Sequence, residues 1–98
     1  MSFETDYDFH LLKNEAEQMV LTELEKQLEE RDPGICRCSE CVLDMAAMAL
    51  NAVKPLYRFS LLGTLYAAQA MNDESYASGV ENAVAQAIDK VSSNPAHD

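Results

Sequence analysis

The sequence predicts an all-α protein: a small helical domain of three to four helices that forms an intertwined homodimer. Apolar residues recur at three- and four-residue steps in two long segments, which is typical of amphipathic helices. A third segment, residues 42–53, is apolar on almost every side. A chain of 98 residues has too few other elements to bury such a helix, so a second subunit is its simplest cover, and a tightly wrapped monomer is the alternative.

The first helix is expected over residues 8–31. Its apolar positions are Leu11, Leu12, Ala16, Met19, Val20, Leu24 and Leu28. Thr5, Asp6 or Asp8 would cap its start, because such side chains accept hydrogen bonds from the backbone N–H groups of a first turn. Asp32-Pro33-Gly34 is expected to end the helix, since this run favours a turn.

The second helix is expected to begin at Ser39 and to end before Pro55, because proline disfavours the helical conformation in the residue that precedes it. Residues 56–62 are aromatic and partly alternating in polarity, which fits an extended segment or a brief helix. Gly63 is expected to interrupt the chain after this segment.

Residues 64–71 are weakly helical, and a final amphipathic helix is expected over about residues 74–91. The whole chain, residues 1–98, is then expected to be one domain with a core of about residues 8–91. Residues 92–98 would form a flexible tail.

Charge and composition argue against several classes of protein. The net charge is −10, and no apolar stretch approaches the ~20 residues that span a bilayer, so neither direct nucleic-acid binding nor membrane insertion is expected. Residues 1–32 carry −7 and residues 61–98 carry −4, whereas residues 33–60 carry +1. The first residues show no signal-peptide pattern, which favours a cytoplasmic protein.

The three cysteines are the most informative residues of the chain. Cys36, Cys38 and Cys41 are its only cysteines and form a C-x-C-x-x-C run directly after the expected turn. Thiolates are strong zinc ligands, and this spacing folds three sulfurs around one ion, so the sequence predicts a structural Zn²⁺ site. An odd cysteine count does not fit a disulfide framework, but Cys38 and Cys41 also form a C-x-x-C pair, which leaves a thiol redox switch as an alternative.

The fourth zinc ligand stays open at this point. Asp44 lies three residues after Cys41, Glu40 lies inside the run, and His10 is the only histidine ahead of the tail. Water or a group from a second chain would also complete the site.

Catalysis is not expected. Three thiolates donate much charge to a zinc ion and blunt its acidity, and the chain offers no serine–histidine pairing, glycine-rich phosphate loop or convincing carboxylate pair.

The stretch that begins at Cys36 and continues through Asp44, an apolar helix, Leu50-Asn51 and Pro55-x-Tyr57 resembles the late competence development protein ComFB family. Asn14 and Glu17 add an Asn-x-x-Glu pattern that is similar to the same family. The resemblance covers about residues 14–60. It implies a small α-helical homodimer, with zinc held by the three cysteines in a regulatory or adaptor protein that acts on an unidentified protein partner.

Other members of the family are receptors for cyclic dinucleotides such as c-di-GMP, so the resemblance implies a second function, in which c-di-GMP or c-di-AMP acts through the dimer. The candidate ligand-binding residues are Asn51, Lys54, Tyr57 and Arg58. Two cations of those receptors are replaced here, one by Leu43 and one within Asn51-Ala52-Val53-Lys54-Pro55. Phosphates require cations and bases require planar groups, and Tyr57 and Arg58 supply one of each.

Overall fold

The computed structural model describes residues 2–95, and these residues are mostly helical. In chain order its elements are α1 (Phe3–Asp6), the 3₁₀ turn η1 (Phe9–Leu11), β1 (Lys13–Asn14), α2 (Glu15–Glu30), α3 (Ser39–Ala52), β2 (Tyr57–Arg58), α4 (Leu61–Met71) and α5 (Glu74–Ser93). The two strands pair antiparallel, with Lys13 opposite Arg58 and Asn14 opposite Tyr57. The structure therefore confirms a mostly helical fold, to which it adds a small two-stranded sheet and a fifth helix, the four-residue α1.

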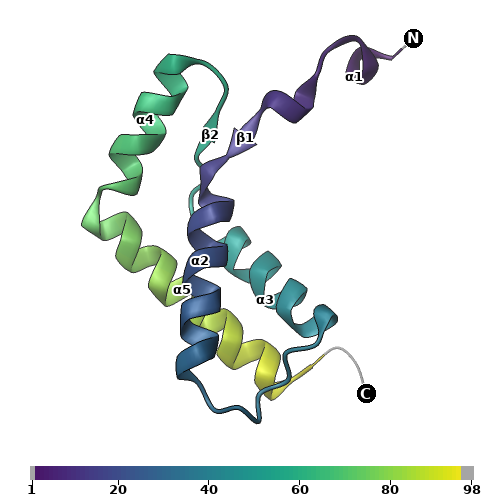
Figure 1. The fold of residues 1–98 in the computed structure, drawn as a ribbon, viewed down its shortest axis with the longest axis vertical. Coiled ribbons are helices and arrows are strands. Elements are labelled where there is room, and N and C mark those ends of the chain that lie inside the picture. The colour runs from purple at the N-terminus through teal and green to yellow at the C-terminus, as the bar shows by residue number, and fades with distance from the viewer. Residues whose placement is uncertain (1, 96–98) are drawn as a thin grey trace.

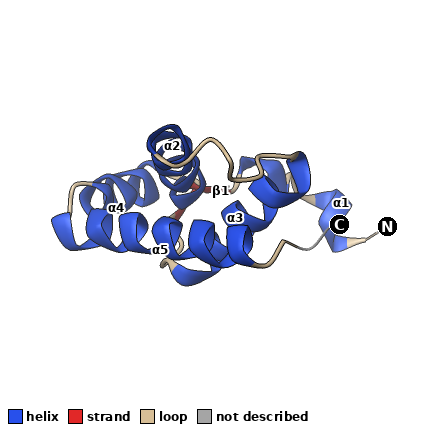
Figure 2. Cartoon of the chain, turned by 90° about the horizontal axis from the view of Figure 1, so that it is seen from below, coloured by secondary structure: helices blue, strands red, loops and turns tan. Residues whose placement is uncertain are grey.

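Helices α2, α3 and α5 enclose the main core. Its largest fully buried side chains are Met45, Ile88, Val20, Val84 and Cys41. Figure 2 shows α2 lying across one side of a layer that contains α3, α4 and α5. The molecule is accordingly flat, 45 × 38 × 18 Å, and its shortest dimension matches about two helix diameters.

Helix α3 buries one face and exposes the other. Met45 and Ala49 are fully buried, whereas Leu43 is 65% exposed and Met48 is 39% exposed. The described chain alone therefore does not cover this helix on every side. No helix among residues 2–95 is long and apolar enough to span a bilayer.

The expected start of the first helix was wrong. The segment ahead of the helix contains η1 and β1 instead, and the helix begins at Glu15. Asn14 explains the boundary: its side-chain Oδ1 accepts hydrogen bonds from the backbone N–H of Ala16 at 3.1 Å and of Leu56 at 2.8 Å. One amide oxygen thus caps α2 and fastens the segment before β2 to it.

The second half of the chain follows its sequence pattern more closely. Helix α3 begins at Ser39 as predicted, and α5 runs two residues beyond its predicted end, to Ser93. Gly63 does not interrupt the chain, because it lies in the first turn of α4, which Ser60 caps by accepting a hydrogen bond from the Gly63 N–H. Residues 92 and 93 of the expected tail therefore belong to α5, and residues 96–98 lie outside the described residues.

Residues 3–12 form an arm that projects from the body at the end opposite the α2–α3 loop (Figure 1). Neither α1 nor η1 contains a buried residue. The aromatic rings of Phe3, Tyr7 and Phe9 contact one another instead, with centroid distances of 4.9 to 6.4 Å.

Replacing Asn14 by alanine is expected to lower the free energy of unfolding by about 1–2 kcal/mol, because two backbone donors lose their acceptor. Urea unfolding at one fixed protein concentration measures this loss. Asn14→Asp is the matched control, since it keeps an oxygen acceptor at the same place and should cost much less. Equal losses in both variants would contradict the double-acceptor role.

Candidate metal centre

The cysteines lie on the loop between α2 and α3 and on the first turn of α3. Asp32 shapes this loop, because its side-chain Oδ1 accepts a hydrogen bond from the Gly34 N–H at 2.8 Å and its carbonyl accepts one from the Ile35 N–H at 3.1 Å. This local turn reverses the chain directly after α2. Cys36, Cys38 and Cys41 follow it and end inside the same small volume.

The three sulfur atoms all lie within 4.8 Å of one another. Sulfurs around a tetrahedral zinc ion with Zn–S bonds of ~2.3 Å lie roughly 3.8 Å apart, so this cluster needs only a small contraction to hold one ion. Cys41 is buried, Cys36 is half-buried and Cys38 is exposed. The cluster therefore spans the boundary between the core and solvent.

Cys38 also caps helix α3. Its Sγ accepts a hydrogen bond from the Cys41 backbone N–H at 3.4 Å, in the position of an N-cap side chain. A backbone donor thus already points at a sulfur of the cluster.

The pKa values of two thiols move in opposite directions. Hydrogen bonds from the backbone of Cys38, and then from the thiols of Cys38 and Cys41, lower the pKa of Cys36. Burial, followed by the hydrogen bonds and charges of its two neighbours, raises the pKa of Cys41 to about 12. The sulfurs compete for negative charge, and a bound cation removes that competition by stabilising all three thiolates.

Arg37 lies between Cys36 and Cys38 in the sequence, and its side chain fastens the loop to the end of α2. One guanidinium nitrogen, Nη2, donates to the Leu28 carbonyl at 2.6 Å. The other, Nη1, donates to the carbonyls of Ile35 at 2.8 Å and of Asp32 and Pro33 at 3.3 Å each. Arg37 thus joins the last turn of α2 to the loop that carries the cysteines.

None of the three candidates for a fourth ligand belongs to the sulfur group, and no His, Asp or Glu of residues 2–95 adds to it. His10 is in η1, on the arm at the opposite end of the molecule (Figure 1). Glu40 is exposed on the first turn of α3, and Asp44 lines a groove between α3 and α5.

The four candidate ligand-binding residues do not form one site. Asn51 lines the α3–α5 groove, whereas Tyr57 and Arg58 line a polar hollow of about 650 Å³ beside β1 and the start of α2. Arg58 already forms an ion pair with Glu15, and Lys54 is exposed and accepts a hydrogen bond from the Tyr76 hydroxyl at its backbone carbonyl. A phosphate at Arg58 would have to compete with the Glu15 carboxylate.

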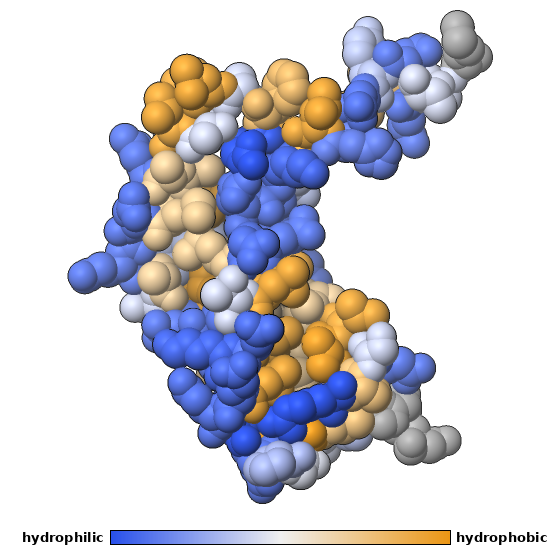
Figure 3. All heavy atoms as spheres, in the orientation of Figure 1, coloured by the Kyte–Doolittle hydropathy of each residue, from blue (hydrophilic) through white to orange (hydrophobic). Residues whose placement is uncertain are grey.

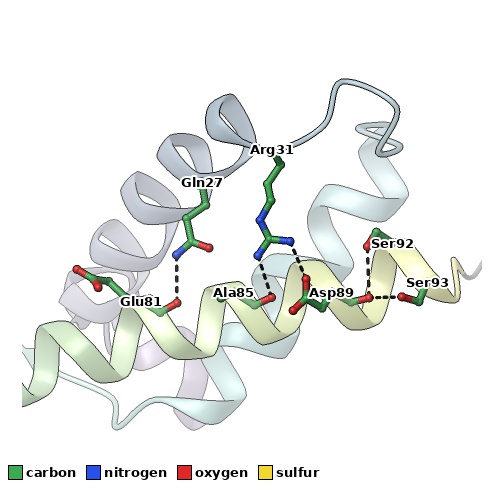
Figure 4. Close-up of polar contacts among 7 residues, drawn as sticks. All are labelled: Gln27, Arg31, Glu81, Ala85, Asp89, Ser92 and Ser93. Atoms are coloured by element: carbon green, nitrogen blue, oxygen red, sulfur yellow. Dashed lines mark hydrogen bonds and ion pairs between the residues drawn. The ribbon is translucent and has the colours of Figure 1, made fainter.

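Polar contacts join the C-terminal end of α2 to α5 (Figure 4). The Gln27 amide donates to the Glu81 carbonyl at 3.1 Å, and Arg31 pairs with Asp89 at 2.6 Å. The sequence pattern predicted neither the ion pair of Arg31, nor the clamp of Arg37, nor the two bonds of Asn14. An asparagine directly before a helix is a recognisable cap signal, but long-range carbonyl contacts leave no sequence pattern.

Residues 13–95 match the family profile described as late competence development protein ComFB. A solved structure of the late competence protein ComFB from Bacillus subtilis superposes with a TM-score of 0.69 at 24% identity, covering 87% of this chain and 92% of that chain. This similarity is one of fold. No curated protein matches the sequence significantly.

Proposed function

Because the chain belongs to the late competence development protein ComFB family, we propose that it is a small, zinc-binding, dimeric regulatory or adaptor protein without catalysis. The observation that carries the proposal is the group of three sulfurs within 4.8 Å. A donor set of three thiols suits Zn²⁺ better than it suits Mg²⁺ or Ca²⁺, which prefer oxygen ligands.

The zinc ion would act as part of the fold. Cys41 belongs to the main core, while Cys36 and Cys38 lie on the loop after α2. One ion bound to all three would therefore fasten the end of α2 to the start of α3. In a domain this small, metal binding at such a joint stabilises the folded state directly. The same three thiolates make the ion a poor Lewis acid, which supports a role without catalysis.

In the proposed dimer, a second copy of the chain packs on the exposed face of α4. Leu61, Leu62, Leu65 and Tyr66 are each at least 55% exposed, and Ala67 is the only buried residue of this helix. Figure 3 shows the apolar side chains gathered at the start of α4. Helix α4 is also the only helix of residues 2–95 without a charged residue. Two chains of charge −10 repel each other least when they meet at such an uncharged surface.

A receptor for cyclic dinucleotides is the second candidate function. The polar hollow favours it, since Tyr57 and Arg58 lie there with Lys13 and His10, which joins an aromatic ring to basic groups. Binding of a cyclic dinucleotide at this hollow would require its phosphate to replace Glu15 as the partner of Arg58.

Native mass spectrometry of zinc-supplied protein, with and without c-di-GMP or c-di-AMP, tests both functions. We expect a dimer with two zinc ions. Added nucleotide mass would establish the receptor function as well. A metal-free chain would contradict the zinc proposal, and a zinc-loaded monomer would contradict the dimer.

A further inference from the structure

We propose that Arg37 is a positioning residue of the metal centre: its guanidinium sets the path of the loop so that the three sulfurs converge. This inference rests on the proposed zinc site. It goes beyond that site because Arg37 offers no metal ligand and acts only through the backbone that carries Cys36 and Cys38.

The hydrogen bonds of the Arg37 guanidinium are the first evidence for this role. Four carbonyl oxygens, those of Leu28, Asp32, Pro33 and Ile35, accept hydrogen bonds from one guanidinium group. Three of these residues belong to the loop and one belongs to the last turn of α2. Fixing four backbone groups through one planar fork leaves the segment between α2 and Cys36 little freedom.

The connection between the loop and α2 is the second piece of evidence. The loop contains two local arrangements: the Asp32 turn holds Gly34 and Ile35, and the cysteines are hydrogen-bonded to one another, with Cys38 also capping α3. Arg37 connects these two local arrangements to α2. Without Arg37, the turn and the cysteines would no longer be fastened to the last turn of α2, and part of the free energy of metal binding would go into ordering the loop.

The positive charge of Arg37 is the third piece of evidence. A zinc ion with three thiolates bears a net charge of −1, and the segment of residues 32–53 contains three acidic side chains besides. Arg37 is the one basic side chain of that segment. Its charge therefore has the sign opposite to that of the zinc–thiolate group and of the acidic side chains of the same segment.

The test compares zinc affinities of the full chain by competition with a chelator of known affinity. Arg37→Ala is expected to weaken zinc binding about 10- to 100-fold, the usual range for residues that orient ligands. Arg37→Lys keeps the charge but donates from a single nitrogen, so its affinity should be intermediate. The Co²⁺-loaded forms add a spectroscopic signature, since a displaced sulfur changes the thiolate charge-transfer absorption.

Arg31→Ala is the matched control. It removes the same charge six residues away, but Arg31 contacts Asp89 and the Ala85 carbonyl on α5 rather than the loop. We expect it to lower thermal stability with zinc affinity and the Co²⁺ spectrum unchanged.

The possible failures are distinguishable. Wild-type protein that binds no zinc would overturn the zinc site itself. Wild-type protein that binds zinc no more tightly than Arg37→Ala would overturn the positioning role alone. If Arg37→Ala does not fold, Arg37→Lys decides, because wild-type affinity in that variant would show that the fork is not needed.

Discussion

Replacing Cys41 by serine is expected to abolish tight zinc binding and to destabilise the chain even when no metal is present. Two effects combine at this position. The variant loses one of three sulfur ligands, so the stabilisation that zinc adds to the folded state is lost. It also places a hydroxyl group in a core position that is 1% exposed, and a hydroxyl costs more to desolvate than a thiol does.

Thermal unfolding with and without a chelator separates the two effects. Wild-type protein should lose stability when the chelator is added, whereas Cys41→Ser should not respond to it. In the presence of chelator, we expect Cys41→Ser to melt roughly 10 °C below the wild type, as suits a buried polar substitution in a domain of this size.

Cys38→Ser is the matched control for the core effect. Its side chain is exposed, and serine is a preferred N-cap residue, so the hydroxyl can accept the hydrogen bond that the Cys41 N–H now gives to sulfur. This variant should also lose the zinc response, yet its metal-free form should melt close to the metal-free wild type. A zinc response that survives in both variants would contradict the metal centre.

The sulfur cluster was accessible to sequence reasoning because its information is local. Three cysteines within six residues predict a sulfur cluster, and the structure brings all three sulfurs together. Helices α3 and α5 were accessible for the same reason, since a period of three to four residues depends only on neighbours along the chain.

The parts that could not be predicted depend on contacts between distant segments. The start of α2 was wrong because β1 exists only through its pairing with β2, more than forty residues further along the chain. Two-residue strands have no alternation that a sequence pattern could reveal. The ion pair of Arg58 with Glu15 arises from the same pairing, and it turns a candidate ligand-binding cation into a partner of α2.

The exposed face of α4 supports the remaining prediction, which concerns the dimer. Leu65→Glu is expected to convert the protein to a monomer at micromolar concentration. A carboxylate buried in an apolar interface costs several kcal/mol, and each 1.4 kcal/mol weakens association about tenfold, so the dissociation constant should rise by about 100-fold or more. Sedimentation over a range of protein concentrations measures this change, with circular dichroism to show that the helices persist.

Leu43→Glu is the matched control, because it makes the same substitution at a leucine that is even more exposed, 65% against 55%, on the outer face of α3. If the second copy packs on α4, this variant remains a dimer, since its new charge stays in solvent. If Leu43→Glu alone dissociates the dimer, the interface lies instead at α3, whose apolar outer face also lacks a cover within the described chain. The decisive difference between the two faces is charge: the outer face of α3 includes Asp44, whereas α4 has no charged residue to desolvate when two strongly acidic chains meet.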